Sequence, residues 1–457
     1  MWSPAEASGR VPTPAALSDW LGTALPRPSR YLLAYSGGLD SSVLLHLLAR
    51  VRDSLPAPLS AMHVEHGLHP ASAAWAQHCE ATCAALGVPF AVASVHAAAQ
   101  PGESREAAAR EARYAALGAA LGAGGMLLTA QHLDDQVETF LLQLLRGAGL
   151  EGLSGMPVVR SWQDGWQVRP LLGCRRATLA GWAREQGLHW IEDPSNADQS
   201  LDRNYLRRGV LPLIEARWPG AAGAIARSAG HCAEAAALVA SLAQQDLAAA
   251  AVEEGERLAL DFLRQLPSQR ASQLLRHWLR SRGAPALPAR RLREALRQLC
   301  AARGDAAPCI RWAGWALRRY RDQVWLVQEQ PGPLQPFKWD GATCDLEGGL
   351  GTLERRMAPG GIDPAHWRSG SVEVRSRWSG MRCRPAGRAG HRDFKHLAQD
   401  CGIPPWLRDQ VPVVVIDGRP AAVAGCCVCA PFAAAPGQSG WWVDWRPRGT
   451  LPLSRLP

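Results

Sequence analysis

The sequence almost lacks lysine, and this absence excludes one common phosphate-binding loop. Lys338 and Lys395 are the only lysines among 50 basic residues, so the other 48 are arginine. The Walker pattern G-x-x-x-x-G-K-[ST] needs a lysine, and none occurs before residue 338. Arginine suits bidentate phosphate contacts and stacking on bases, so this bias and the formal charge of +9 indicate a polyanionic partner. Compositional drift in an Ala/Arg/Gly-rich chain would produce the same bias.

Long hydrophobic runs are also missing. No apolar stretch reaches the ~20 residues needed to span a bilayer, and the N-terminal "MWSPAEASGRVPTP" lacks the basic-then-apolar layout of a signal peptide. Apolar residues make up 47% and charged residues 20% of the chain, which is typical of globular proteins. We therefore expect no membrane partner, a cytoplasmic location and, for 457 residues, roughly two to four domains.

The twelve cysteines show little sign of a metal site or a disulfide framework. In a cytosolic protein of this size most of them are expected to be small buried apolar residues. Cys426 and Cys429 form a C-x-x-C, but a metal site needs about four ligands and Cys401 is the nearest other thiol. We therefore interpret this cluster as part of a buried strand of small apolar residues.

Strand-like and helix-like segments alternate from residue 31 to residue 147. The predicted strands are 31–35, 59–64, 89–95 and 126–131, and the predicted helices are 40–51, 73–86, 103–121 and 133–146. This alternation predicts parallel strands with crossover helices, hence a doubly wound α/β sheet. A helical, Ala/Arg-rich part with a hairpin at 309–328 and a small α+β part follow. The predicted domains are 1–218, 219–335 and 365–440.

The stretch "SGGLDSS" (36–42) separates the first predicted strand from the first predicted helix. Gly37 and Gly38 allow backbone N–H groups to close on phosphate oxygens, and Ser36 and Ser41 add hydroxyl groups. The positive end of the helix that begins near Asp40 adds to this anion site. An acid beside a triphosphate is useful only if a metal ion bridges them or if it aligns a nucleophile.

This stretch resembles the S-G-G-x-D-S loop of the N-type ATP pyrophosphatases. Those enzymes grip the β- and γ-phosphates, cut between the α- and β-phosphates, and release pyrophosphate after adenylating a substrate. The resemblance implies that residues 36 to 41, Leu39 included, bind ATP, and that Asp40 is catalytic and holds Mg²⁺. A loop that grips departing pyrophosphate can use amides, hydroxyls and Mg²⁺ in place of a lysine.

Further motifs resemble those of the tRNA(Ile)-lysidine synthetases, in the same order. They are "HVEHGL", "AREARY", "TAQHLDDQVET", "LLRGAGLEGLSGM", "RPLL", "WIEDPSNADQSLDRNYLR" and the C-terminal "GMRCRPAGRAGHRDFKHLAQDCGIPPWLRDQVPVVV". The resemblance covers most of the chain from about 30 to 430. One departure is Gln131, where a histidine is usual.

The resemblance implies roles for residues that follow the phosphate loop. His63 and His66 would help to form the nucleotide pocket; with His69 they could mimic a metal site, but on a strand-to-loop segment they would not converge without a sharp turn. Arg110 and Arg113 lie one helical turn apart and would stabilise the α-phosphate as catalytic residues. A solvated helix face with acidic neighbours is the alternative interpretation.

The remaining implied sites concern lysine and tRNA. Asp135 and Glu138, one turn apart, would hold free L-lysine, whereas acids in a first helical turn are also common dipole partners. A tRNA phosphate or AMP would contact a basic cluster, for which a solvated helix start is the alternative. This cluster comprises Arg203, Asn204, Arg207 and Arg208, of which the first three are the predicted contacts. In the terminal part, Lys395, Trp406 and Arg408 would hold the tRNA body.

The implied reaction is ATP-dependent ligation of free L-lysine to C2 of cytidine 34 in the CAU-anticodon tRNA(Ile). An adenylated cytidine would form with loss of pyrophosphate, and lysine would then displace AMP. A tRNA thiolase is a rival, but such enzymes often need paired cysteines, and Cys79, Cys83 and Cys174 form no C-x-x-C. A catalytically silent tRNA-binding protein is the second rival. A homodimer is one oligomeric state that this interpretation allows.

Overall fold

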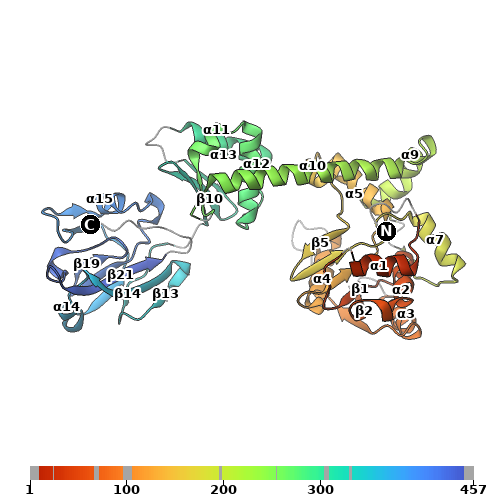
Figure 1. Ribbon diagram of the computed structural model, residues 1–457, viewed down its shortest axis with the longest axis horizontal. Helices are drawn as coiled ribbons and strands as arrows, with labels where there is room; N and C mark the ends of the chain where they lie inside the picture. The colour runs from red at the N-terminus through yellow and green to blue at the C-terminus, as the bar shows by residue number, and fades with distance from the viewer. Residues whose placement is uncertain are drawn as a thin grey trace. The chain divides into compact units, whose positions relative to one another are not determined.

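The computed structural model describes residues 10–23, 25–65, 71–95, 105–194, 198–253, 255–302, 308–328 and 332–446. The chain divides into two compact units, residues 1–238 and 239–457, which we describe separately (Figure 1). No helix in the described part of the chain is long and apolar enough to cross a membrane.

A six-stranded sheet in the order β3-β2-β1-β4-β6-β5 forms the centre of the first unit. Its strands are β1 (Tyr31–Ala34), β2 (Leu59–Glu65), β3 (Phe90–Ser94), β4 (Met126–Leu128), β5 (Val159–Trp162) and β6 (Gly165–Val168). All neighbours pair in parallel except β5, which is antiparallel to β6. The four predicted strands are therefore confirmed, and the β5–β6 hairpin extends the sheet beyond the prediction.

Helices cover both faces of this sheet. The helices are α1 (Pro14–Thr23), α2 (Leu39–Ala49), α3 (Ser72–Ala85), α4 (Arg105–Leu121), α5 (Leu133–Leu145), α6 (Leu150–Leu153) and α7 (Arg176–Glu185). Side chains of β1 alternate between two cores: Tyr31 and Leu33 join the core with α1, α2, α3 and α7, whereas Leu32 joins the core with α4. The predicted doubly wound α/β fold is confirmed.

The strand order reverses between β1 and β4. From β1 the chain runs outward to β2 and β3, and it then returns to β4 on the other side of β1. The loops that leave the carboxyl ends of β1 and β4 therefore run in opposite directions and open a crevice, which is where doubly wound sheets bind ligands. The two most informative motifs, "SGGLDSS" and "TAQHLDD", occupy these two loops.

The rest of the first unit is helical. It contains α8 (Asp202–Tyr205), the π-helical turn η3 (Leu206–Val210), α9 (Leu211–Arg217) and the start of α10 (Ala221–Ala250). A π-helical turn is rare and is frequently found at functional sites. Here it carries Arg207, from the basic cluster predicted to contact AMP or tRNA.

The second unit contains two hydrophobic cores. One core lies between helices α11 (Leu260–Gln265), α12 (Ser268–Ser281) and α13 (Ala289–Ala301) and a sheet in the order β7-β8-β11-β10-β9. Its strands are β7 (Ala251–Val252), β8 (Arg257–Ala259), β9 (Cys309–Trp312), β10 (Trp315–Tyr320) and β11 (Gln323–Gln328). The predicted hairpin at 309–328 is thus present as the antiparallel β9, β10 and β11.

The other core, from Leu334 to Trp445, is rich in β-structure. One of its sheets has five strands: β12 (Phe337–Lys338), β15 (Val372–Arg375), β18 (Val413–Ile416), β19 (Arg419–Val423) and β20 (Cys427–Val428). Another has three strands: β13 (Cys344–Leu346), β14 (Gly351–Pro359) and β21 (Ser439–Arg446). Helices α14 (Pro364–Ser369) and α15 (Phe394–Asp400) complete this α+β part (Figure 1). The boundaries proposed from sequence at 218, 335 and 365 stay a prediction.

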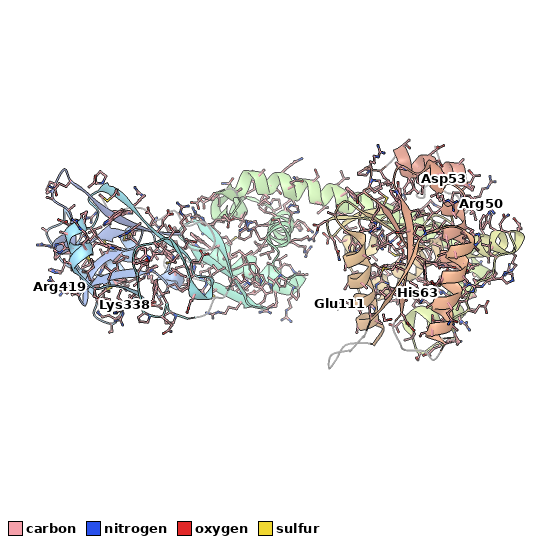
Figure 2. All side chains as sticks on the ribbon, turned by 90° about the horizontal axis from the view of Figure 1, so that it is seen from below. Arg50, Asp53, His63, Glu111, Lys338 and Arg419 are labelled. Atoms are coloured by element: carbon pink, nitrogen blue, oxygen red, sulfur yellow. A yellow bond between two sulfur atoms is a disulfide. The ribbon has the colours of Figure 1, made fainter. Side chains whose placement is uncertain are left out.

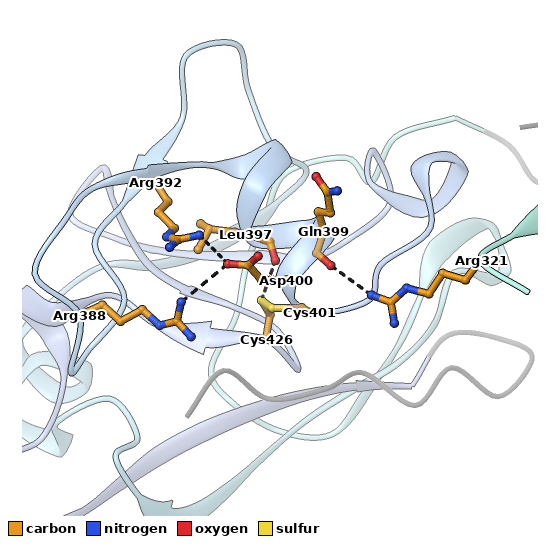
Figure 3. Close-up of a disulfide and its surroundings, with 8 residues drawn as sticks. All are labelled: Arg321, Arg388, Arg392, Leu397, Gln399, Asp400, Cys401 and Cys426. Atoms are coloured by element: carbon orange, nitrogen blue, oxygen red, sulfur yellow. Dashed lines mark hydrogen bonds and ion pairs between the residues drawn. A yellow bond between two sulfur atoms is a disulfide. The ribbon is translucent and has the colours of Figure 1, made fainter. Parts of the chain in front are cut away.

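Two disulfides lie in this C-terminal part. Cys383 pairs with Cys429, and Cys401 pairs with Cys426. Figure 3 shows the second pair at the end of α15, beside Asp400, whose carboxylate bonds Arg392. The cysteines are buried as expected, but the interpretation of Cys426 and Cys429 as unpaired apolar residues is wrong.

Trp406 packs within the second unit. Its ring lies edge-on to Tyr320 and Trp325, with centroids 6.0 and 5.9 Å away, and the Arg318 guanidinium lies 5.1 Å from its centroid. Arg321, beside Tyr320, also donates to the Gln399 carbonyl (Figure 3). These contacts dock the segment after α15 onto β10 and β11, so Trp406 has a structural role in the unit that the sequence did not indicate.

Candidate active site

The loop between β1 and α2 is ordered by its own hydroxyl groups. Ser36 Oγ and Ser41 Oγ are 3.0 Å apart, and Ser41 Oγ donates to the Gly38 carbonyl at 3.0 Å. Gly38 is extended and precedes the first helical residue, Leu39, which is buried. The first N–H groups of a helix point out of its N-terminus and form an anion site. The loop therefore presents amides and hydroxyls together, as the sequence predicts.

Gly37 holds this loop against the protein core. Its φ of +76° is in the left-handed region, and its carbonyl accepts from the Ile191 N–H at 2.8 Å. A Cβ on Gly37 would lie 2.5 Å from Ile191 Cδ1 and 2.9 Å from Cys79 Sγ. The residue therefore shapes the loop from beneath and does not line the cavity described below.

Replacing Gly37 with alanine should destabilise the first unit. The new Cβ adds left-handed strain and two clashes, which together cost about 2 kcal/mol. Thermal unfolding of Gly37→Ala should show a lower Tm than wild type. Gly22→Ala is the control, because nothing lies within 4 Å of that Cβ and Gly22 is helical. Equal Tm values for Gly37→Ala and wild type would contradict this account.

Asp40 lies in the first turn of α2, and its two carboxylate oxygens have different surroundings. Oδ2 is 3.6 Å from His132 Nε2 and 3.9 Å from Arg176 Nε. Oδ1 is buried and has no hydrogen-bond partner within the described residues. Burial raises the pKa of Asp40, although the charges of His132 and Arg176 oppose this. Such an oxygen suits a cation or a donor brought by a ligand.

His132 links the two loops of the crevice and was not recognised as a site residue from the sequence. It caps α5: its Nδ1 accepts from the Asp135 N–H at 3.3 Å, and Asp135 Oδ2 accepts from the His132 N–H at 3.0 Å. Because Nδ1 accepts a hydrogen bond, the ring hydrogen is on Nε2. This Nε2 is 3.6 Å from Asp40 Oδ2 and 3.4 Å from Asp135 Oδ2. The position of this histidine between β4 and α5 was the available signal.

The two acids predicted to bind lysine meet two of the arginines predicted to bind AMP or tRNA. Arg207 Nε donates to Glu138 Oε1 at 2.6 Å, and its Nη2 donates to Glu138 Oε2 at 3.0 Å and Asp135 Oδ1 at 3.1 Å. Arg203 Nε is 3.3 Å from Glu138 Oε2. Glu138 is fully buried, and burial raises its pKa, while the hydrogen bond and charge of Arg207 oppose this.

Not every member of the basic cluster is available to a ligand. Asn204 is buried, and its Nδ2 donates to the Asp198 carbonyl at 2.8 Å. Its side chain therefore fixes the start of α8. Asp135 does act as a helix cap, as the alternative interpretation expected, but Glu138 lies beyond the cap and is engaged by arginine.

A cavity of about 570 Å³ lies at the crevice. Among the predicted site residues, it is lined by Ser36, Gly38, Asp40, Ser41, His63, Arg110, Arg113, Asp135 and Arg203. His63, labelled in Figure 2, is buried on β2 with its Nδ1 3.0 Å from the Tyr35 carbonyl, and burial lowers its pKa. His66 lies outside the described residues. The volume is in the range of small-molecule sites.

One wall of this cavity carries an excess of positive charge. The guanidinium groups of Arg110 and Arg113 lie 5.0 and 5.7 Å from the Tyr114 ring centroid. Arg169 is 3% exposed, and it donates to two neutral acceptors, the Pro157 carbonyl and Gln167 Oε1. A buried cation with neutral partners favours a nearby anion. Arg110 is exposed, Arg113 is half-buried, and both line the cavity, whereas Arg169 does not, so the phosphate interpretation of Arg110 and Arg113 and that of a solvated face both stay predictions.

The other predicted contacts lie in the second unit. Lys395 lines a basic hollow of about 780 Å³ with Arg377, Trp378, Arg382, His391, Arg392 and His396. Arg408 lies outside this hollow, and its Nε donates to the Ile403 carbonyl at 3.4 Å. No group of three or more His, Cys, Asp or Glu side chains suited to a metal ion occurs in the described ranges.

Three family models match successive parts of the chain. A PP-loop domain matches residues 17–214, the TilS substrate binding domain matches 258–325, and the TilS substrate C-terminal domain matches 372–445. A solved U34-tRNA thiolase of Methanococcus maripaludis with its [4Fe-4S] cluster is a distant likeness. Its TM-score is 0.41 and its identity 16%, over 48% of this chain and 78% of that chain.

Curated relatives match along nearly the whole chain. The tRNA(Ile)-lysidine synthase of Methylococcus capsulatus is 45% identical over 92% of this chain and 97% of its own length. That of Alkalilimnicola ehrlichii is 42% identical over 93% of this chain and 97% of its own length. The motif resemblance is confirmed, and the chain belongs to the tRNA(Ile)-lysidine synthase family.

Proposed function

We propose that the chain ligates free L-lysine to C2 of cytidine 34 in the CAU-anticodon tRNA(Ile), with ATP as the energy source. The observation that carries this proposal is the cavity at the reversal of strand order, which joins the S-G-G-x-D-S loop to Asp135 of α5, with Glu138 held to Asp135 through their shared partner Arg207. One reaction then uses both, because the loop binds the phosphoanhydride part of ATP and the acids bind an amine. The family relationship supports the same reaction.

In the first step, the cytosine C2 oxygen attacks the α-phosphorus of ATP, and pyrophosphate leaves. The amides and hydroxyls of residues 36 to 41 bind the departing pyrophosphate, and Arg110 and Arg113 stabilise the charge on the α-phosphoryl group. Mg²⁺ fits this site, because enzymes commonly hold it through one or two carboxylates and substrate phosphates, and the buried Asp40 Oδ1 has no hydrogen-bond partner among the described residues. When bound, it supplies charge neutralisation for the phosphates.

In the second step, the ε-amine of lysine attacks C2 of the adenylated cytidine, and AMP leaves. The reference pKa of a lysine amine is about 10.4, so the site must accept a proton before the attack. Asp135 and Glu138 hold the amine, and their partners Arg203 and Arg207 move toward AMP or a tRNA phosphate. The position of Arg207 on a π-helical turn supports such an exchange.

The Arg113→Ala variant should lose adenylation more than it loses ATP binding. Loss of one donor that acts in the transition state costs about 3 kcal/mol, which is about a hundredfold in rate. Pyrophosphate release should therefore slow by this factor, while the Kd of ATP changes little. A fall in ATP affinity that matches the fall in rate would instead assign Arg113 to ground-state binding.

The proposal also includes contacts to the tRNA outside the cavity. CAU-bearing methionine tRNAs offer a similar loop cytidine, so discrimination requires contacts elsewhere on the tRNA. We assign these to the second unit, to Lys395 in the basic hollow and to Arg408 outside it. We further propose a cytoplasmic location and a homodimer as the assembly to test.

One assay tests the function. The chain is incubated with ATP, Mg²⁺, tRNA(Ile) and labelled lysine, and label in the tRNA is measured, with a methionine tRNA as control. Label should enter only tRNA(Ile), with one AMP and one pyrophosphate released per lysine. Absence of label under these conditions would refute the proposal. The thiolase alternative is disfavoured, because Cys79, Cys83 and Cys174 form no C-x-x-C and all three are buried.

A further inference from the structure

A buried polar network lies behind the part of the cavity wall that Arg110 and Arg113 form. Its centre is Gln167 on β6, which is fully buried. Gln167 Oε1 accepts from Arg160 Nε at 2.7 Å and Arg169 Nη2 at 2.9 Å. Two guanidinium donors on one side fix the orientation of this amide, so its NH₂ group must face the other way.

The amide of Gln167 in turn fixes a tyrosine. Gln167 Nε2 donates to Tyr114 Oη at 3.2 Å and to Thr129 Oγ1 at 3.3 Å. Thr129 directs its own hydroxyl hydrogen to the Val168 carbonyl at 3.3 Å. Tyr114 Oη therefore acts as an acceptor inside the network, and its hydrogen has no acceptor among the described residues.

The surroundings of Tyr114 make its hydroxyl a strong donor. The residue lines the cavity beside Arg110, Arg113 and Asp40. Burial raises the pKa of Tyr114, but the charge of Arg110, the Gln167 hydrogen bond and the charges of Arg113 and Arg169 outweigh it and lower the pKa. A more acidic hydroxyl donates a stronger hydrogen bond to an anionic acceptor.

We propose that the Tyr114 hydroxyl is a catalytic donor to the α-phosphoryl oxygen on which charge grows, and that Gln167 is the positioning residue that turns its hydrogen toward the cavity. The tyrosine keeps its proton throughout, so no bond to it forms or breaks. Charge grows on this phosphoryl group when pyrophosphate leaves and again when AMP leaves. The role rests on the proposed function of the same cavity.

The first variant removes only the hydroxyl. Tyr114→Phe keeps the ring on which Arg110 and Arg113 stack. It should lower single-turnover pyrophosphate release by about a hundredfold, with the Kd of ATP within about threefold of wild type. Tyr31→Phe is the matched control, since Tyr31 is a buried tyrosine of β1 whose hydroxyl bonds the Leu21 carbonyl. It should lose stability but no rate.

The second variant keeps the hydroxyl and redirects its hydrogen. In Gln167→Glu, the carboxylate still accepts from Arg160 and Arg169, but it cannot donate to Tyr114. The tyrosine then donates to the carboxylate, away from the cavity. The rate should fall nearly as far as in Tyr114→Phe, although the new ion pairs preserve the fold. A purely structural role of Tyr114 predicts a near wild-type rate for this variant.

Each outcome of these measurements decides the inference. Slow release with intact ATP binding in both variants supports it. Wild-type release by either variant overturns it, and so does an ATP affinity that falls as far as the rate. The proposed function is judged separately, by lysine-dependent AMP release from the wild-type chain; if that fails while pyrophosphate release persists, the comparison of variants still decides the role of Tyr114. A wild-type chain that releases no pyrophosphate overturns both.

Discussion

Asparagine in place of Asp40 is expected to abolish pyrophosphate release while tRNA binding stays near that of wild type. The substitution keeps the shape of the side chain, which lines the cavity, but removes the negative charge of a carboxylate whose buried Oδ1 has no hydrogen-bond partner in the described part of the chain. The phosphates and their cation then lose the anionic group that aligns them. Pyrophosphate release with ATP and tRNA, and tRNA binding measured in parallel, check this result.

Stability provides a second readout for Asp40→Asn. Burial disfavours the charged form of Asp40, so the neutral amide should leave Tm equal or higher. Asp53→Asn is the control, because that side chain is 93% exposed and pairs with Arg52 at 3.5 Å (Asp53 is labelled in Figure 2). Wild-type turnover by Asp40→Asn would remove Asp40 from the mechanism.

Glutamine in place of Glu138 is expected to block lysine incorporation. Glu138 is fully buried and receives two hydrogen bonds from Arg207. Truncating one partner of a buried charge pair formed on binding costs about 4 kcal/mol of binding free energy, so amine capture should fall by about a thousandfold. Adenylation should persist, because the phosphate loop is intact. Pyrophosphate release and lysine incorporation, measured in the same reaction, separate the two steps.

A matched exposed acid controls for the change of charge. Glu111→Gln, on the exposed surface of α4, should keep both steps at wild-type rate (Figure 2). If Glu138→Gln slows pyrophosphate release as much as lysine incorporation, Glu138 serves the architecture of the cavity and not the amine.

The sheet was predictable because each buried strand carries a contiguous apolar signal. β1 to β4 and α2 to α5 lie within a few residues of their predicted bounds. The prediction extended β4 to residue 131, whereas the strand ends at Leu128, because the loop after it is also weakly apolar. The hairpin of β5 and β6 was missed, since two four-residue strands give too short a pattern to recognise.

The site was predictable where it is local in sequence. The phosphate loop and the capped start of α5 each lie within about one helical turn. The pairing of Arg207 with Glu138 spans 69 residues, and that of Gln167 with Tyr114 spans 53. The disulfides close separations of 46 and 25 residues. The periodicity of apolar residues along the sequence does not indicate such contacts, because they form only when distant segments pack together.

In the proposed lysine site, the contact of Arg207 with Asp135 and Glu138 makes amine capture an ion exchange. An incoming ammonium replaces a resident guanidinium, so the net charge of the pocket does not change, and the carboxylate has already lost its water when the chain folds. Affinity for the amine then reflects a competition between two cations of equal charge. Since the exchange involves little change in exposed charge, lysine affinity should respond weakly to ionic strength, in contrast to tRNA affinity, which falls steeply as salt rises.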